Sequence, residues 1–548
     1  MPGPTFADDL NLADYFLFDR IKEGRGSRIA LRFGDRTWTY DQVADRSRAL
    51  AKFLVAQGLK PEQRVYLVLP DTPAFAWSIF GILAAGGVLC MGNPIAPTED
   101  LAYVCDYVKA AALITTPDVA ERLASSFPGL PNLTTILISP DAATGDDPEA
   151  PVTTKHISLD AAIHRGRELD TTLPKLRRDD PAIWLFTAGS TGRSKAAMHS
   201  HRDFAFNTEV YAKGTVGYRE DDIAVSVPRL FFGYATGTNL WFPFAVGASV
   251  GLFSERPTAE SISAAITRYK ATVVTNVPTM LGKLLDLDDE RKARGEPGLD
   301  LSSVRFHLSA GEALPEPLLR RFQARFPADV YDGIGSAEMF HIYCSNRPGD
   351  IKPGSLGRVV DGYELRILPE EADGAGATPN APGDIGVLWV KGDSVAHGYF
   401  NDRDKSWKTF HGYWCRTGDL FSIDAEGYLY FQGRADDLFK VGGIWVAPRE
   451  VEDCLLAHPA VSVVAVIPAE DAGLTKPKAL VELRPDARDR LATPEARAAL
   501  ADELKAHVQG KLSKHKYPRW VVFVDDLPKN DRGKVDKKTL IEREKRNV

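Results

Sequence analysis

The stretch AIWLFTAGSTGRSKAAMHS, residues 182–200, joins an apolar run to a loop rich in glycine, serine and threonine. The apolar run predicts a buried strand that ends at Phe186. The backbone N–H groups and hydroxyls of such a loop form a cradle for an anion, and a lysine beyond it adds positive charge. A simple surface turn is the alternative interpretation. The candidate phosphate contacts are Thr187, Gly189, Ser190, Thr191, Gly192 and Lys195.

The chain on both sides of this loop alternates short apolar runs with amphipathic helical runs. Helices are expected over residues 258–270 and 316–326. Strand–helix alternation predicts an α/β fold with parallel sheets and helices on both faces. After Asp384 strands dominate, and from about Asp436 helices and strands mix in a small α+β pattern. The strands before Asp384 are expected in RVYLVLP, AALITTP, LTTILIS, AIWLFTA, SVGLFS, ATVVTNVP and VRFHLSAG.

Length and charge limit the class of protein. With 548 residues the chain is too long for one core, so two or more domains are expected. A net charge of −7 argues against a general nucleic-acid binder, whose phosphate contacts need a basic surface. Five scattered cysteines suit a reducing cytoplasm, and the N-terminus lacks the features of a signal peptide.

One uncharged stretch, from Thr72 to Thr98, raises the alternative of a membrane span. Glycines and prolines interrupt it repeatedly. We therefore expect a helix over Ala74–Ala85 followed by a buried strand over Val88–Met91, and no membrane association.

The segment TAGSTGRSKA resembles the phosphate loop of the adenylate-forming superfamily, which includes acyl-CoA synthetases, luciferases and peptide-synthetase adenylation domains. The usual family form is TSGSTGxPKG, and this chain differs at Ala188, Ser194 and Ala196. Ser194 replaces a proline that would fix φ, so the loop is expected to be less rigid. The order GSTGRSK followed by alanine does not fit a Walker loop, which excludes a P-loop motor or kinase.

Two further motifs resemble the adenine side of the family's site. In LSAGEALP, residues 308–315, the resemblance places Gly311 and Glu312 in the adenine pocket. The motif DGIGSAE, residues 332–338, resembles the DGIGSTE form of benzoate–CoA ligases. It implies that Asp332 accepts a hydrogen bond from the adenine amine, that Ile334 packs on the base, and that Glu338 holds Mg²⁺. Ala337 stands where the family has a threonine that contacts the α-phosphate, so that contact is either lost or supplied by Ser336 or Thr191.

The later motifs imply a two-domain enzyme. In RTGDL and GRADD, Asp419 and Arg434 would bind the ribose or a phosphate. The resemblance implies a large N-terminal domain over residues 1–435, with two parallel-sheet α/β subdomains and a distorted β-barrel, and a small mobile α+β domain over residues 436–548. The remaining implied residues are the hinge Asp436, the coenzyme A tunnel residues Gly442 and Gly443, and the catalytic Lys534 in PKNDRGKVDK.

The segment VPRLFFGYATGTNL, residues 227–240, resembles the aryl-pocket segment of benzoate–CoA ligases. Glycine at position 233 replaces an alanine and would leave space for a ring substituent. The histidine at position 341 is either a pocket contact or a satisfied core group. The implied pocket residues are Phe231, Gly233, Tyr234, Gly335 and His341.

These motifs together predict an ATP-dependent aryl carboxylate–CoA ligase. It would adenylate benzoate or a substituted benzoate such as 2-aminobenzoate, release pyrophosphate, and form the aryl-CoA thioester and AMP. The expected partners are an aromatic carboxylic acid, ATP, Mg²⁺ and coenzyme A. The protein itself is expected to be a monomer or a homodimer. Two alternatives stay open: a stand-alone adenylation enzyme that loads a carrier-protein phosphopantetheine, and a nucleotide-binding regulatory protein without turnover.

Overall fold

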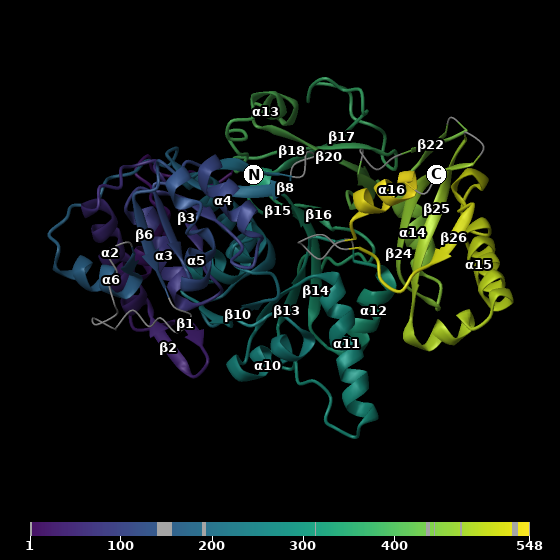
Figure 1. Cartoon of the computed structure of the whole chain (residues 1–548), viewed down its shortest axis with the longest axis horizontal. Coiled ribbons are helices and arrows are strands. Elements are labelled where there is room, and N and C mark those ends of the chain that lie inside the picture. The colour runs from purple at the N-terminus through teal and green to yellow at the C-terminus, as the bar shows by residue number, and fades with distance from the viewer. Residues whose placement is uncertain are drawn as a thin grey trace. The chain divides into compact units, whose positions relative to one another are not determined.

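The computed structural model describes residues 3–139, 156–188, 193–312, 314–434, 439–442, 444–471, 474–528 and 535–546 (Figure 1). Internal contacts divide the chain into two compact units. The first comprises Met1–Leu365, Trp389–Arg416 and Gly427–Leu429. The second comprises Arg366–Leu388, Thr417–Glu426 and Tyr430–Val548. The domain boundary expected between residues 435 and 436 stays a prediction.

A seven-stranded sheet contains the two strands that flank the phosphate-loop motif. Its order is β7-β6-β5-β3-β4-β8-β9, and all neighbours are parallel except the β8–β9 hairpin. Helix α2 packs against α3 and α6. The strands are β3 (Arg64–Val68), β4 (Val88–Met91), β5 (Ala112–Thr115), β6 (Thr135–Ile138), β7 (Ile157–Ser158), β8 (Pro181–Ala188) and β9 (Ser194–Ser200). The helices are α2 (Tyr40–Ala56), α3 (Pro73–Ala84), α4 (Thr98–Tyr107), α5 (Pro117–Leu123) and α6 (Leu159–Glu168).

A nine-stranded sheet has the order β16-β15-β14-β13-β12-β10-β11-β1-β2. Its six central strands are parallel, while β2, β15 and β16 are antiparallel additions. The strands are β1 (Ile29–Phe33), β2 (Arg36–Thr39), β10 (Ile223–Ser226), β11 (Ser249–Leu252), β12 (Val273–Asn276), β13 (Phe306–Ser309), β14 (Asp329–Gly335), β15 (Ile342–Ser345) and β16 (Arg358–Val359). The accompanying helices are α7 (His201–Asn207), η3 (Thr208–Val216), α8 (Gly233–Thr236), η4 (Gly237–Trp241), α9 (Phe242–Val246), α10 (Ala259–Tyr269), α11 (Pro278–Ala293) and α12 (Glu316–Arg325).

These elements confirm the expected α/β fold. Each of the seven predicted strands is present, and α10 and α12 occupy the two predicted helical segments. The uncharged stretch forms α3 and β4, and every residue of α3 is buried inside the protein. Among the described residues, none of the helices combines the length and apolar character that a membrane crossing needs.

A five-stranded sheet follows, with the order β17-β18-β20-β19 and with β21 beside β20, where the sequence predicts a distorted barrel. The last part of the chain has its own core between a three-stranded sheet, β24-β25-β26, and the helices α14 and α15, which confirms a small α+β domain. The elements are β17 (Glu364–Leu368), β18 (Gly386–Lys391), α13 (Arg403–Thr409), β19 (Phe410–His411), β20 (Trp414–Ile423), β21 (Leu429–Arg434), β22 (Phe439–Val441), β23 (Ile444–Val446), α14 (Pro448–Leu456), β24 (Val461–Asp471), β25 (Leu474–Leu483), η7 (Pro485–Leu491), α15 (Pro494–Gln509), η8 (Lys514–Lys516), β26 (Trp520–Phe523) and α16 (Lys537–Arg546).

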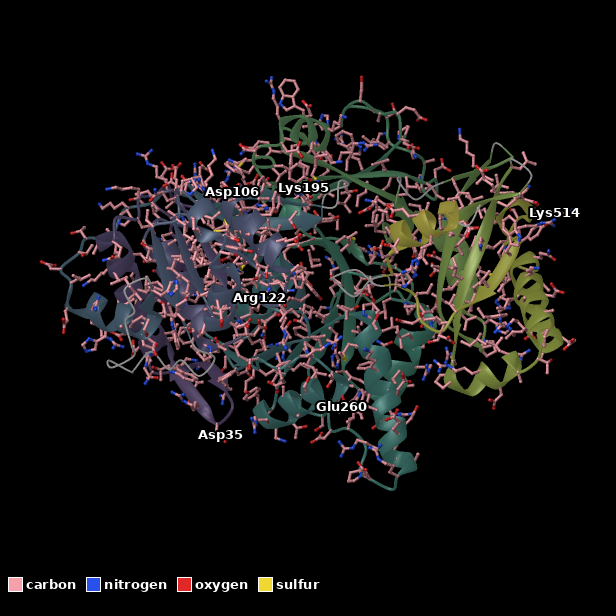
Figure 2. The ribbon with its side chains drawn as sticks, viewed as in Figure 1. Asp35, Asp106, Arg122, Lys195, Glu260 and Lys514 are labelled. Carbon is pink, nitrogen blue, oxygen red and sulfur yellow. The ribbon has the colours of Figure 1, made fainter. Side chains whose placement is uncertain are left out.

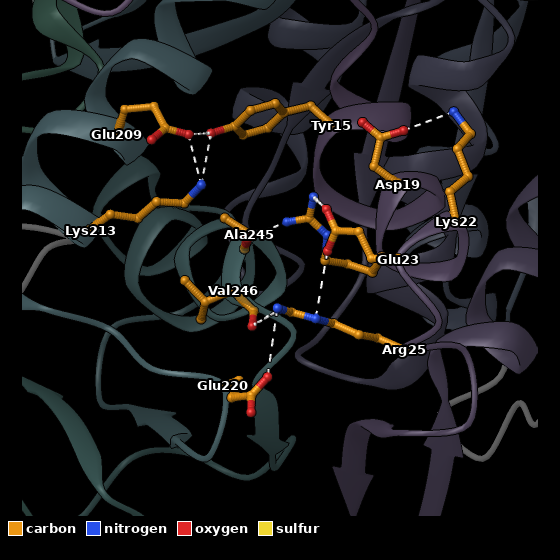
Figure 3. A network of polar contacts seen from close by, with 11 residues as sticks. Tyr15, Asp19, Lys22, Glu23, Arg25, Glu209, Lys213, Glu220, Ala245 and Val246 are labelled. Carbon is orange, nitrogen blue, oxygen red and sulfur yellow. Dashed lines mark hydrogen bonds and ion pairs between the residues drawn. The ribbon is translucent and has the colours of Figure 1, made fainter.

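The N-terminal turns η1 (Asp14–Phe18) and α1 (Asp19–Lys22) are tied to the helices on either side of the segment 227–240 (Figure 3). The guanidinium groups of Arg20 and Arg25 donate to the carbonyl oxygens of Ala245 and Val246 at the end of α9. Cations are favourable there because the last carbonyls of a helix have no partner within it. These contacts, together with a Tyr15–Glu209–Lys213 cluster on η3, brace the scaffold that carries this segment.

Candidate active site

The phosphate-loop segment forms a β8–β9 hairpin in which Thr187 pairs with Lys195. Gly189, Ser190, Thr191 and Gly192 lie outside the described residues, so those four contacts stay predictions. Lys195 is marked in Figure 2, and its Nζ lies 3.7 Å from the centre of the Tyr399 ring. Burial lowers the pKa of Lys195, and the nearby Glu338 carboxylate opposes this effect. Lys195 is therefore a partly desolvated cation held on an aromatic face.

Two tyrosines of α4 hold the base of this hairpin where the family has a proline. The Arg193 guanidinium lies 4.8 Å from the centre of the Tyr103 ring. The Ala196 amide donates to the Tyr107 hydroxyl at 3.4 Å, and the Tyr103 hydroxyl lies 3.5 Å from the Ser194 carbonyl oxygen. Side-chain contacts thus restrain the segment that a proline ring would otherwise restrict. Sequence reasoning missed these tyrosines, because nothing in the motif points to α4.

The turn that carries Glu338 joins two antiparallel strands, β14 and β15, through the 3₁₀ turn Ala337–Met339. A Cβ on Gly335 would lie 2.4 Å from the His341 carbonyl oxygen, so the turn requires glycine there. Phe340 has φ +66°, which is unusual for a residue with a side chain. The turn is therefore tightly constrained at both ends of Glu338. This packing gives Gly335 a structural role, and its place in an aryl pocket stays a prediction.

A buried histidine supports the same turn from β9. The Nε2 atom of His199 lies 2.7 Å from the carbonyl oxygen of Ala337, and its Nδ1 lies 2.8 Å from Oδ2 of Asp203. Asp203 also accepts from the backbone and hydroxyl of Ser200, at 3.2 Å and 2.6 Å, and so caps α7. None of the sequence motifs points to this pair. The pattern of a histidine four residues before an aspartate at a helix start was the available signal.

Asp332 has the properties expected of a residue that accepts a ligand's hydrogen bond. It pairs in register with Ser309 on the neighbouring strand β13. Its carboxyl is buried, and Oδ1 has no hydrogen-bond partner among the described residues. Burial raises its pKa to about 8. An unpaired buried oxygen costs about 1–3 kcal/mol, so a donor such as an adenine amine would be bound favourably here.

The other residues expected around adenine lie on β14 or directly follow the neighbouring strand β13 along the chain. Ile334 follows on β14, and Gly311 follows β13 with φ +88°, a conformation that favours glycine. Glu312 is half-buried, and its Oε2 accepts from Thr279 Oγ1 at 2.8 Å. Ser336 Oγ is buried without a partner among the described residues. This hydroxyl is thus available for the phosphate contact that Ala337 cannot make.

The donor set around Glu338 fits a magnesium ion whose remaining ligands are phosphate oxygens of the substrate and water molecules. Glu338 accepts the Tyr399 hydroxyl through Oε1 at 2.6 Å, and no described residue bonds its Oε2. Over the described ranges, no three His, Cys, Asp or Glu side chains group as a metal cage. Magnesium is commonly bound by one or two carboxylates with phosphate oxygens and water, so a single carboxylate oxygen suits it.

The segment 227–240 is anchored by a buried aspartate after β3 that sequence reasoning missed. Asp71 Oδ1 accepts from the Leu230 amide at 3.0 Å, and Arg229 lies 3.6 Å from its other oxygen. Beyond this anchor, the Phe231 ring packs on Phe232, with the two ring centres 4.3 Å apart. A Cβ on Gly233 would lie 3.1 Å from Leu185 Cδ1. A methyl group at this position would therefore fit only if the Leu185 side chain shifted by a few tenths of an ångström.

His341 is packed among aromatic rings next to this segment. Its ring centre lies 4.7 Å from that of Phe242 and 5.4 Å from that of Tyr234. Its Nε2 lies 3.0 Å from the Tyr234 carbonyl oxygen, while Nδ1 has no partner among the described residues. Burial lowers its pKa to about 3, so the ring is neutral, and Nδ1 is an acceptor. A Cβ on Gly237 would lie 2.4 Å from its Cδ2, so His341 can lie here only beside a glycine.

The residues expected to bind ribose and coenzyme A belong to the second unit. Asp419 lies in β20, where its amide donates to Thr417 Oγ1 at 3.2 Å. Arg434 ends β21, and Gly442 forms the turn between β22 and β23 with φ +59°. The hinge Asp436, the tunnel residue Gly443 and the catalytic Lys534 lie outside the described residues, so their roles stay predictions.

Comparison with known proteins defines the class. Residues 18–400 match the model of the AMP-binding enzyme family, and residues 450–534 match the AMP-binding enzyme C-terminal domain. The benzoate–CoA ligase of Thauera aromatica is 37% identical over 98% of this chain and 96% of its own length. A crystal structure of an anthranilate CoA ligase in complex with anthranoyl-AMP superposes with TM-score 0.87 at 32% identity, covering 98% of both chains. A benzoate CoA ligase structure from Burkholderia xenovorans gives TM-score 0.82 at 34% identity, covering 97% of this chain and 99% of that one.

The chain belongs to the AMP-binding enzyme family. Within this family it is an AMP-forming acid–thiol ligase, a class that uses ATP and coenzyme A. The resemblance stated from the sequence motifs is thereby confirmed.

Proposed function

We propose that the protein is an aryl carboxylate–CoA ligase acting on a benzoate-type acid, either benzoate or a ring-substituted benzoate such as 2-aminobenzoate. The observation that carries this proposal is the short segment from Asp332 to His341, which comprises the end of β14 and the turn that carries Glu338. It joins a buried acceptor suited to adenine, a carboxylate suited to Mg²⁺, and a histidine packed on the aromatic segment 227–240. Relatives at 37% and 34% identity that are named benzoate CoA ligases support the same class of acid.

The first reaction joins the acid to the α-phosphate of ATP. A carboxylate oxygen attacks the α-phosphorus, the bond to the β-phosphate oxygen breaks, and pyrophosphate leaves. Asp332 would orient the base and Lys195 would neutralise the leaving phosphates, while Lys534 would bring positive charge to the acid and α-phosphate. Mg²⁺ held by Glu338 would offset phosphate charge. The protein's part is thus orientation and charge compensation.

The second reaction needs no protein nucleophile. The acyl-adenylate is a mixed anhydride, so the coenzyme A thiolate attacks its carbonyl carbon and AMP leaves. We propose that the C-terminal domain over residues 436–548 rotates about Asp436 between the two steps, which presents Lys534 for adenylation and the side that carries Gly442 and Gly443 for thioester formation. Asp419 and Arg434 would hold the ribose throughout. The five cysteines, all within the described residues, form no disulfide, as a reducing cytoplasm would keep them.

The decisive experiment measures pyrophosphate and AMP release with a panel of acids. The panel contains benzoate, 2-aminobenzoate, 2-hydroxybenzoate and 4-hydroxybenzoate, with cyclohexanecarboxylate as a non-aromatic control. We expect at least one benzoate to exceed the control by two orders of magnitude in kcat/KM, and AMP release to require coenzyme A. A preference for the control would refute the aryl assignment. Turnover with a phosphopantetheinyl carrier protein in place of coenzyme A would identify the carrier-loading alternative instead.

A further inference from the structure

A single tyrosine lies between the two charged groups assigned to phosphate and metal binding. The face of the Tyr399 ring contacts the Lys195 ammonium at 3.7 Å from the ring centre. Its hydroxyl donates to Glu338 Oε1 at 2.6 Å. Tyr399 is 4% exposed, whereas its two partners, Lys195 and Glu338, are half-buried. One side chain therefore contacts both charges.

The backbone of this tyrosine is fixed on both sides. The segment 396–400 runs antiparallel to β9, with an Ala197–Tyr399 bridge. The His397 amide donates to the Met198 carbonyl at 2.8 Å, and the Phe400 amide donates to the Ala196 carbonyl at 3.0 Å. The Ala396 amide donates to the Glu338 carbonyl at 2.8 Å, which connects the segment to the turn that carries Glu338. The Tyr399 ring is thus placed by the two elements whose charges it contacts.

The tyrosine also separates the two charges. The structure forms no ion pair between Lys195 and Glu338, both of which lie within the described residues. The Glu338 carboxylate nevertheless interacts electrostatically with Lys195, and opposite charges that are partly desolvated attract each other strongly. The ring satisfies the ammonium through its electron-rich face, and the hydroxyl satisfies one carboxylate oxygen. The other carboxylate oxygen and the remaining ammonium protons stay available to ligands.

We propose that Tyr399 is a positioning residue that keeps Lys195 and Glu338 apart and aimed at their ligands, through its ring for the phosphate lysine and through its hydroxyl for the metal carboxylate. This inference rests on the proposed roles of Lys195 and Glu338. It predicts that the two functions of Tyr399 can be removed one at a time, because phenylalanine retains the ring and leucine retains neither group.

The test compares Tyr399→Phe, Tyr399→Leu and the wild type by calorimetric binding of a non-hydrolysable ATP analogue, with excess Mg²⁺ and with EDTA. Binding of the analogue needs neither the acid nor turnover. For Tyr399→Phe we expect the Mg²⁺-dependent gain in affinity to fall about tenfold, with little change in EDTA. For Tyr399→Leu we expect a further loss of roughly three- to tenfold in EDTA as well, since Lys195 can then pair with Glu338. Tyr40→Phe is the matched control, because it removes another buried hydroxyl, which donates to the Ala248 carbonyl at 2.7 Å.

A double-mutant cycle between Lys195→Ala and Tyr399→Leu tests the ring contact directly. If the ring holds the ammonium, the two losses in EDTA are not additive. An unchanged Mg²⁺-dependent gain in Tyr399→Phe overturns the proposal, and this variant decides the matter even where Tyr399→Leu folds poorly. A wild type that binds the analogue but activates no benzoate contradicts the proposed function instead, so the two failures are distinguishable.

Discussion

The imidazole of His199 donates from Nε2 to the carbonyl oxygen of Ala337 at 2.7 Å, and so connects β9 to the turn that carries Glu338. Asp203, 2.8 Å from Nδ1, fixes the orientation of the ring. Because a carbonyl oxygen can only accept, this contact is lost in any variant without a donor at this position.

His199→Phe should therefore slow adenylation about tenfold, because the Ala337 carbonyl loses its donor and the Glu338 turn loosens. Thioester formation from a supplied acyl-adenylate should change much less. Pyrophosphate release and CoA-ester formation, measured separately well below the melting temperature, check this. The control is His458→Phe, which removes a buried histidine paired with Glu503 in the second unit. An equal loss in both half-reactions would indicate a role in stability alone.

Lys534→Ala should abolish adenylation while leaving thioester formation from synthetic acyl-adenylate largely intact. The lysine is expected to serve only the phosphoryl step, and loss of such a charge contact costs on the order of 10²–10³ in rate. Lys537→Ala is a matched control nearby, since Lys537 pairs with Glu452 at 2.7 Å. Similar losses in the two half-reactions would contradict the assignment of Lys534.

The contribution of Asp332 to the stability of the ligand-free protein should fall as pH rises from about 4 to about 8, and Asp332→Asn should remove this contribution. Burial raises the pKa of Asp332 to about 8 from an ordinary value of 3.8. Within this window the folded protein retains a proton that the unfolded chain has released, so each pH unit costs up to about 1.4 kcal/mol. Urea unfolding from pH 5 to 9 measures the difference between variant and wild type. A difference independent of pH would show that Asp332 does not titrate in this range.

Gly233→Ala should reduce activity on a 2-substituted benzoate more than on benzoate. The new methyl would lie 3.1 Å from Leu185 Cδ1 and 3.6 Å from the Phe340 carbonyl oxygen, so it fits after a small shift but fills the space beside the ring segment. One methyl in such a pocket changes relative kcat/KM by roughly 10–200-fold. The comparison uses benzoate, 2-aminobenzoate and 2-hydroxybenzoate. A uniform change across the three acids would mean that Gly233 does not contact the ring.

His341→Ala should lower kcat/KM for amino- and hydroxybenzoates and spare benzoate if Nδ1 accepts a hydrogen bond from the ring substituent. The neutral ring and the unpartnered Nδ1 support an acceptor role. 2-Fluorobenzoate is the matched control acid, because fluorine cannot donate. If His341 is only a core group, all acids should suffer alike and the melting temperature should fall.

The strands and helices were largely predictable because their apolar runs are short, periodic and bounded by glycine or proline. Strand β4 has the predicted bounds, and α3 differs from its prediction by one residue at each end. Asp332 and Glu338 could be proposed because they lie within one contiguous motif. Tyr399, His199 and Asp71 could not, because each acts on a residue far along the chain. Such contacts depend on how β9, the segment 396–400 and the end of β3 meet, which no local pattern encodes.

The backbone pairing between β9 and the segment 396–400 has a consequence for the synthesis of the protein. At about 5–20 residues per second, β9 is synthesised roughly ten to forty seconds before Tyr399. Until then the Ala196 and Met198 carbonyls lack their partners from this segment, and a strand with unpaired backbone groups is a site for wrong pairing. The charged centre of this ligase is thus assembled late, and a chaperone that shields nascent β9 would favour its yield.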